Sequence, residues 1–265
     1  MFQEKQEESR TLAGGEAKVT RTISNPDANG GLQVVQRETE DSRQVSPGVR
    51  TTSTTVMTPD GNGGFSPSVQ TERRETKAND GTIQFKKSTL LSDGAGGWKL
   101  SEVREGSMRQ DGQAVTKEER VSRPDGEGKL ALVERTVSKE GQGSSADKRD
   151  TTETYSSNVP GVAGDGSLQL VQRETTVHRA ATSGARTTTR QVEQPTPGEE
   201  NGGLQVTRES IDIVRPGGGA TDESHTILAP TSDGRMGQVW VDTGKTDNPA
   251  AVKVDTAPAP ATKPK

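Results

Sequence analysis

The sequence has no cysteine among its 265 residues and very few aromatic side chains. The first absence excludes disulfide frameworks, thiolate nucleophiles and cysteine-ligated zinc sites. Aromatic residues make up 2% of the chain, which is too few to stack the bases of a single-stranded nucleic acid. Lys and Arg, 34 in number, are interleaved with 38 Asp and Glu and form no clustered basic patch. We therefore expect no nucleic-acid partner.

Long hydrophobic runs are also missing from the sequence. No stretch approaches the roughly 18 apolar residues that a membrane-spanning helix needs, so we expect no membrane insertion. Residues 1–8 are mostly charged and polar and lack the apolar region of a signal peptide. The cytoplasm is the default location, and a surface or secreted location reached by a non-classical route stays open.

Apolar residues are too scarce for a thick core. The hydrophobic class accounts for 26% of the chain, and much of that share is alanine and valine. A two-layer core is therefore not expected, and an ordered form must depend on backbone hydrogen bonds and thin local contacts. Substantial disorder is one alternative that this composition allows.

The chain does contain a repeated turn, rich in Asp, Asn and Gly. The first residues after its copies are at positions 32, 65, 98, 130, 168, 204 and 238. This spacing predicts about seven repeats of about 33 to 38 residues. The differences in length fall at a second, looser turn in the middle of each repeat.

Each repeat has the pattern strand, variable turn, strand, fixed turn. Thr and Val favour strands, and Gly, Asp and Asn supply the positive φ angles of tight turns. The sequence thus predicts an all-β fold, an elongated antiparallel meander of about fourteen strands that is largely single-layer. A β-solenoid and a propeller built from paired repeats are alternatives. The array is expected over residues 16–243, between a charged N-terminal tail (1–15) and a disordered Pro/Ala-rich tail (244–265).

Apolar and charged residues occupy different parts of the strands. The apolar ones gather beside the fixed turns, which predicts a narrow apolar stripe along one margin of the sheet. Further along the strands, arginines recur beside glutamates. We expect these arginines to fall at equivalent places in the stacked repeats: Arg37, Arg104, Arg135, Arg173 and Arg208.

Two kinds of ligand site are conceivable from the sequence. Four residues of the fixed turns have oxygen ligands at loop spacing for calcium, namely Asp27, Asn29, Asp60 and Asn62. Calcium needs six to eight oxygens, so a plain hairpin turn is the competing interpretation. Trp98 and Trp240 are candidates for stacking on a carbohydrate, with packing in the apolar stripe as the alternative. No cofactor is expected.

The sequence Asp-x-x-Gly-(Gly/Arg)-Leu followed by a Thr-rich strand recurs over most of residues 25–240. This pattern resembles the YD (RHS-type) repeats of bacterial surface and toxin proteins. The resemblance implies a bacterial repeat protein built from hairpins. The chain departs from that family in its longer period and in lacking the signature tyrosine, because its one tyrosine, Tyr155, lies outside the turns.

These features predict a non-catalytic protein. The two histidines, His178 and His225, lie far apart in sequence, and no nucleophile, phosphate-binding or metalloprotease motif occurs. We expect a structural or interaction repeat protein that acts as spacer, scaffold or binding surface. Its sheet edges would pair with a protein partner or with a second copy. The alternative is a ligand-binding module that uses calcium or glycans at the repeated Asp-Gly turns.

Overall fold

A computed structural model describes residues 4–11, 16–144, 146–158, 167–196, 203–217 and 220–247. All regular structure in this part of the chain is β-strand. The strands are β1 (Glu4–Thr11), β2 (Ala17–Pro26), β3 (Leu32–Ser46), β4 (Val49–Pro59), β5 (Phe65–Lys77), β6 (Ile83–Ser92), β7 (Trp98–Asp111), β8 (Ala114–Pro124), β9 (Leu130–Gly143), β10 (Asp147–Ser156), β11 (Gln169–Ala180), β12 (Arg186–Pro195), β13 (Leu204–Pro216), β14 (Ala220–Pro230) and β15 (Met236–Asp247).

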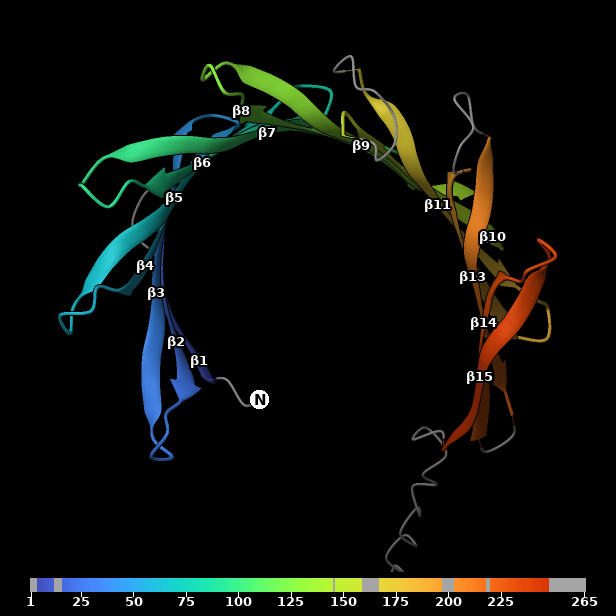
Figure 1. Cartoon of the computed structure of the whole chain (residues 1–265). Coiled ribbons are helices and arrows are strands. Elements are labelled where there is room, and N and C mark those ends of the chain that lie inside the picture. The colour runs from blue at the N-terminus through green and yellow to red at the C-terminus, as the bar shows by residue number, and fades with distance from the viewer. Residues whose placement is uncertain are drawn as a thin grey trace, which may run out of the picture. The chain divides into compact units, whose positions relative to one another are not determined.

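The strands form one open antiparallel sheet in which every strand lies beside its neighbours in sequence. Figure 1 shows this order as a continuous change of colour from β1 to β15. The prediction of an all-β antiparallel meander is therefore confirmed, and a solenoid with one repeat per coil is not formed. No helix in the described part of the chain is long and apolar enough to span a membrane.

The strand boundaries follow the repeated turns of the sequence. Strands β3, β5, β7, β9 and β13 begin at the first residue after a fixed turn, and β11 and β15 begin within two residues of that position. Each repeat contributes two strands, as predicted. The structure has one strand more than the fourteen expected, because Glu4–Thr11 forms β1 and pairs with β2. This strand lies inside the segment that the sequence predicted as a charged tail.

The chain divides into two compact units. The first comprises residues 1–142, 150–174 and 194–205, and the second comprises 143–149, 175–193 and 206–265. The predicted array of residues 16–243 is therefore divided between two units, and strands β9 to β13 contribute residues to both. Most of the predicted C-terminal tail lies outside the described residues, apart from the end of β15.

The sheet has almost no buried side chains. In the described part of the chain, only Val103, Val121, Thr175 and Ser210 are buried, and Val121 is the most enclosed at 2% exposure. The apolar residues beside the fixed turns do pair across strands, for example Leu90 with Leu100. They stay partly exposed, and Leu32 and Leu130 are each 49% exposed. The predicted stripe is therefore a surface feature, and backbone hydrogen bonds and cross-strand contacts hold the sheet.

A β-bulge recurs at the same place in the repeats. The residue without an opposite partner is the fourth of its strand in each case: Val35, Ser68, Ser101, Val133 and Val239. The Ser68 hydroxyl donates to the Val56 carbonyl at 3.2 Å, and Thr207, fourth in β13, donates to Val192 at 3.3 Å. A bulge adds one residue to one strand and increases its twist. The bulge therefore decides which side chains beyond it reach which face.

Candidate functional site

Successive residues of a strand point to opposite faces of the sheet, and the register connects these faces from strand to strand. The two arginines Arg73 and Arg74 are neighbours on β5 and so define the two faces of the first unit. We call them the Arg73 face and the Arg74 face. The register places Thr52 and Lys87 beside Arg73, and Thr51 and Lys86 beside Arg74.

One cation on the Arg73 face is neutralised by several carboxylates. The Arg21 guanidinium bonds Glu7 and Glu40 at 2.9 Å each and also contacts Glu38. Hydrogen bonds to Glu40, Glu7 and Glu38 raise the pKa of Arg21 above its usual range. The Arg21 side chain is only 21% exposed, and its charge is neutralised by carboxylates of the same sheet.

A second arginine of this face has the same arrangement. Arg104 bonds Glu102 at 2.5 Å and Glu119 at 2.7 Å, and Arg123 bonds Glu102 at 3.0 Å. Burial alone would raise the pKa of Glu102, but the hydrogen bonds from Arg104 and Arg123 outweigh it, and the pKa is lowered. Arg21 and Arg104 thus offer little free positive charge to a ligand.

On part of the Arg74 face, the charged side chains also bond to one another. Arg135 bonds Glu118 at 3.0 Å and lies 5.6 Å from the centre of the Tyr155 ring. The Tyr155 hydroxyl donates to Glu153 at 2.9 Å, and Arg173 bonds the same carboxylate at 2.9 Å. The bonds from Tyr155 and Arg173 lower the pKa of Glu153, although burial opposes them. This cluster is a structural network between β8 and β11.

Over β3 to β6 the Arg74 face is different. Arg43 of β3 lies opposite Thr51, which lies opposite Arg74, which lies opposite Lys86. Lys86 bonds Glu105 at 2.6 Å, but both side chains are more than half exposed. Among the described residues, neither Arg43 nor Arg74 has a carboxylate within ion-pair distance, and both are exposed. Two guanidinium groups are therefore available to solvent.

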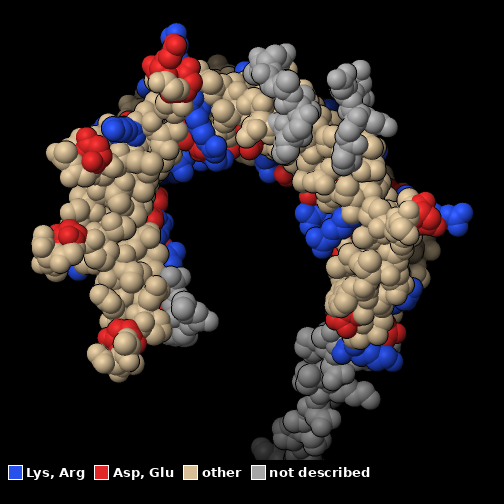
Figure 2. Space-filling view, in the orientation of Figure 1, with Lys and Arg blue, Asp and Glu red and all other residues tan. Residues whose placement is uncertain are grey.

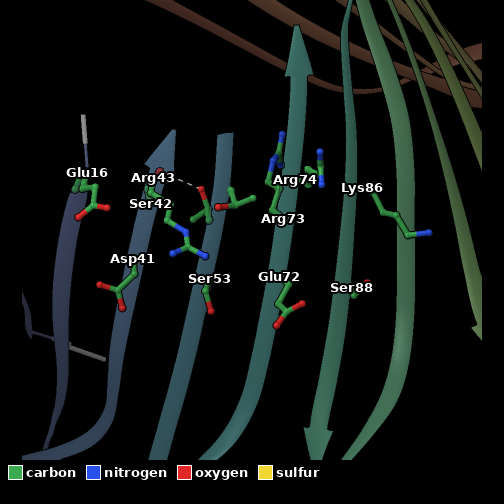
Figure 3. Close-up of a pocket in the computed structure, with 13 residues that line it drawn as sticks. Glu16, Asp41, Ser42, Arg43, Ser53, Glu72, Arg73, Arg74, Lys86 and Ser88 are labelled. Atoms are coloured by element: carbon green, nitrogen blue, oxygen red, sulfur yellow. Dashed lines mark hydrogen bonds between the residues drawn. The ribbon is translucent and has the colours of Figure 1, made fainter. Parts of the chain in front are cut away.

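A second row of polar residues runs beside these cations. Asp41 lies opposite Ser53, Ser53 opposite Glu72, and Glu72 opposite Ser88. The two rows line a hollow of about 670 Å³ on the Arg74 face. Figure 3 shows Arg43, Arg74 and Lys86 in one line, and Asp41, Ser53, Glu72 and Ser88 in a second line below it. We call this hollow the two-row groove.

The residues that the sequence suggested for calcium serve their own turns. The Asp27 carboxylate accepts the backbone N–H groups of Asn29 and Gly31, each at 2.8 Å. Asp60 accepts those of Asn62 and Gly64 at 2.8 and 3.0 Å. The space-filling view shows acidic groups at the tips of these turns (Figure 2).

Sister turns show what the asparagines contribute. Asp93 accepts the N–H groups of Ala95 and Gly97, and Asp125 accepts those of Glu127 and Lys129. The turn therefore forms without an asparagine at its third position. Within the described residues, no group of three or more His, Cys, Asp or Glu side chains is placed to hold a metal ion.

The two tryptophans lie in different units. Trp98 begins β7 opposite Ser92 and is 36% exposed. Trp240 of β15 packs edge-on against His225, with ring centres 5.2 Å apart. His225 also contacts the carboxylate of Asp212 through Nδ1. Each tryptophan keeps one exposed part, and stacking on a carbohydrate stays a prediction.

Sequence reasoning did not find the two-row groove, because it depends on the register of three hairpins. A signal was present in the doublets Arg73-Arg74 and Lys86-Lys87, since two adjacent cations in a strand must put one charge on each face. The expectation of equivalent arginines needs correction. Arg104 lies three residues beyond its bulge, whereas Arg37 and Arg135 lie two beyond theirs, so Arg104 reaches the opposite face.

No protein-family model, curated protein or solved structure is significantly similar to this chain. The resemblance to YD repeats stays a prediction. The function must therefore be inferred from the geometry of the sheet.

Proposed function

We propose that the protein is a non-catalytic repeat scaffold whose open sheet provides a binding surface and whose edge strand β15 pairs with a second copy. The observation that carries the proposal is the open, single-layer sheet, which leaves a strand without a second neighbour at each edge of the described part of the chain. Such an edge presents unused backbone N–H and C=O groups to any extended chain.

The burial pattern supports a non-catalytic role. General acid–base or nucleophilic catalysis needs reacting groups in a concave and partly dry site. Only four side chains are buried in the described part of the sheet, and none of the four is ionisable. The two-row groove is polar and open to solvent, which suits binding better than chemistry.

The two edge strands differ in charge and in exposed apolar surface, and both differences favour β15 for pairing with another strand. In β1, five of the eight residues are charged, and charge on an edge strand opposes pairing with another strand. Strand β15 instead exposes Val239 at 61%, Trp240 at 47% and Val241 at 42%. Pairing of two β15 strands would cover this apolar segment and satisfy the free backbone groups, which favours β15 as the pairing edge.

Analytical ultracentrifugation over a wide concentration range tests the pairing. We expect the mass of the full chain to rise toward that of a dimer with increasing concentration. The double substitution Val239→Lys and Val241→Lys places charge on the edge and is expected to raise the dissociation constant about tenfold or more.

The matched control is Gln6→Lys with Ser9→Lys, which adds the same charge to the opposite edge strand β1. This variant should associate like the unchanged protein. A mass that stays monomeric at every concentration contradicts self-association, and an equal loss in the β1 variant contradicts the choice of β15.

A further inference from the structure

The two-row groove has the chemistry of a site for a charged polymer. We propose that it binds a linear acidic polysaccharide that runs across strands β3 to β6. The acid groups of the polymer would bond Arg43, Arg74 and Lys86, and its hydroxyl groups would bond the row of Asp41, Ser53, Glu72 and Ser88.

The first support is the availability of the cations. Arg21 and Arg104 on the Arg73 face are enclosed by carboxylates of the same sheet. Arg43 and Arg74 are exposed and have no such partner among the described residues, so they lose no internal bond when a ligand arrives. Arginine also binds carboxylate and sulfate groups with two parallel hydrogen bonds, which gives direction as well as charge.

The second support is the spacing of the cations. Neighbouring strands of a sheet lie roughly 4.8 Å apart, so Arg43 on β3 and Arg74 on β5 are separated by roughly 10 Å across the strands. Lys86 lies one strand further, directly opposite Arg74. The three charges thus follow one line at right angles to the strands. A linear polymer with an acid group on each unit meets this line over several units.

The row of acidic and hydroxyl side chains beside the cations favours a polyanion that also carries neutral hydroxyl groups. Carboxylates such as Asp41 and Glu72 accept hydrogen bonds from sugar hydroxyl groups, and Ser53 and Ser88 can both donate and accept. The same carboxylates repel a ligand that bears only phosphates on that side. A sugar acid offers both an anion and neutral hydroxyl groups, and so matches both rows (Figure 3).

The position of the aromatic side chains argues against a nucleic acid. Arginine covers three of the six aromatic rings of the chain: Arg37 lies 4.3 Å from the centre of Phe65, Arg73 lies 4.8 Å from that of Phe85, and Arg135 covers Tyr155. No aromatic side chain lines the groove. Sequence-independent binding of single strands depends on base stacking, which this surface does not offer.

Isothermal titration calorimetry with the full chain and an oligouronate of defined length tests the proposal. The variant Arg43→Gln/Arg74→Gln removes two positive charges from the groove, and we expect its dissociation constant to rise about a hundredfold. The control Arg50→Gln/Lys87→Gln removes two charges from the Arg73 face of the intervening and neighbouring strands β4 and β6. It should bind like the unchanged protein. Because all four side chains reach solvent, unchanged circular dichroism and melting temperature are expected for both variants.

The proposal would be overturned by no heat of binding with the oligouronate, by an equal loss in both double variants, or by tighter binding of a single-stranded DNA that carries the same number of charges. The last result would assign the groove to nucleic acid. A neutral oligosaccharide with the same backbone should not bind, and if it binds equally well the arginines have no part in recognition. None of these outcomes affects the ultracentrifugation test, because the groove lies on a face and the pairing edge is β15.

Discussion

Gly106 shows how a single residue shapes the Arg73 face. It lies in the middle of β7, opposite Phe85 of β6, where a residue without a side chain is unusual. A Cβ atom at this position would lie 2.3 Å from the Glu118 carbonyl oxygen and 2.7 Å from the Phe85 ring. The ring occupies the space that the glycine leaves, and Arg73 covers the ring from the next strand.

We therefore expect Gly106→Ala to destabilise the fold by about 1–3 kcal/mol, since the backbone oxygen of Glu118 cannot move without disturbing β8. Urea unfolding followed by circular dichroism measures the change. The control is Gly126→Ala in the turn between β8 and β9, where an added Cβ meets nothing within 4 Å. Equal midpoints for the two variants would contradict the packing of Phe85 on Gly106.

At the scale of the element, the fixed turn depends on one carboxylate. Asp60 holds the N–H groups of Asn62 and Gly64, while Gly63 adopts a φ of 84° that other residues rarely reach. The last position of the turn is less demanding. A Cβ at Gly64 would approach Asp60 closely, yet the equivalent position in the turn of Asp125 is Lys129. The aspartate and the glycine with positive φ are thus the essential parts of the turn.

Asp60→Ala is expected to destabilise the protein by about 1 kcal/mol, because two backbone N–H groups lose the carboxylate that accepts their hydrogen bonds and must bond water instead. Asp60→Asn keeps an acceptor oxygen and should lose less. Asn62→Ala should have little effect, since its backbone N–H is retained. Thermal melts of the three variants provide the comparison, and a larger loss in Asn62→Ala than in Asp60→Ala would contradict this account of the turn.

The strands and turns were predictable from the sequence, but the register was not. Turn residues mark the ends of the strands, and Thr and Val fill the strands between them, so local chemistry is enough to place both. The bulge leaves no local signal, because its position is occupied by Val35 in one repeat and by Ser68 in another. The bulge falls at the same position in both strands, so the opposite faces of Arg37 and Arg104 follow from their places in the strands, sixth in β3 and seventh in β7.

At the scale of the whole molecule, ion pairs add to the backbone hydrogen bonds of a sheet that has almost no buried side chains. Glu102 and Glu118 illustrate the effect of pH. Burial opposes ionisation of both, but bonds from Arg104 and Arg123 to the first, and from Arg135 and Arg120 to the second, lower their pKa values below 4.5. Their contribution to stability is fully present above the unfolded value and is lost as the pH falls through the folded value.

We accordingly expect the melting temperature to be constant near neutral pH and to fall by several degrees as the pH drops below about 4.5. Differential scanning calorimetry at a series of pH values measures this. Glu102→Gln should melt lower at neutral pH and show a shallower acid dependence, because one of the titrating groups is gone. A melting temperature that rises on acidification would contradict the sign of these pKa shifts.

The candidate site could be predicted only in part. Composition excluded a cysteine-based site, and the scarcity of aromatic residues argued against a base-stacking surface. The two-row groove joins Arg43 of one repeat to Arg74 and Lys86 of the next, and it exists only when neighbouring hairpins pair in one particular register. The sequence of a single repeat does not show which of its residues will lie beside residues of the next repeat.

The recurring bulge has a consequence for the gene as well as for the sheet. Each repeat adds two strands, so the next repeat begins in the same chain direction, and residues at equivalent strand positions point to the same face. Unequal recombination between two copies of the repeat would therefore duplicate or remove a whole hairpin and leave the remaining strands in phase. The insertion of one codon within a strand would instead exchange the two faces beyond it. Such an array can therefore change its length by whole hairpins without exchanging the faces of the remaining strands.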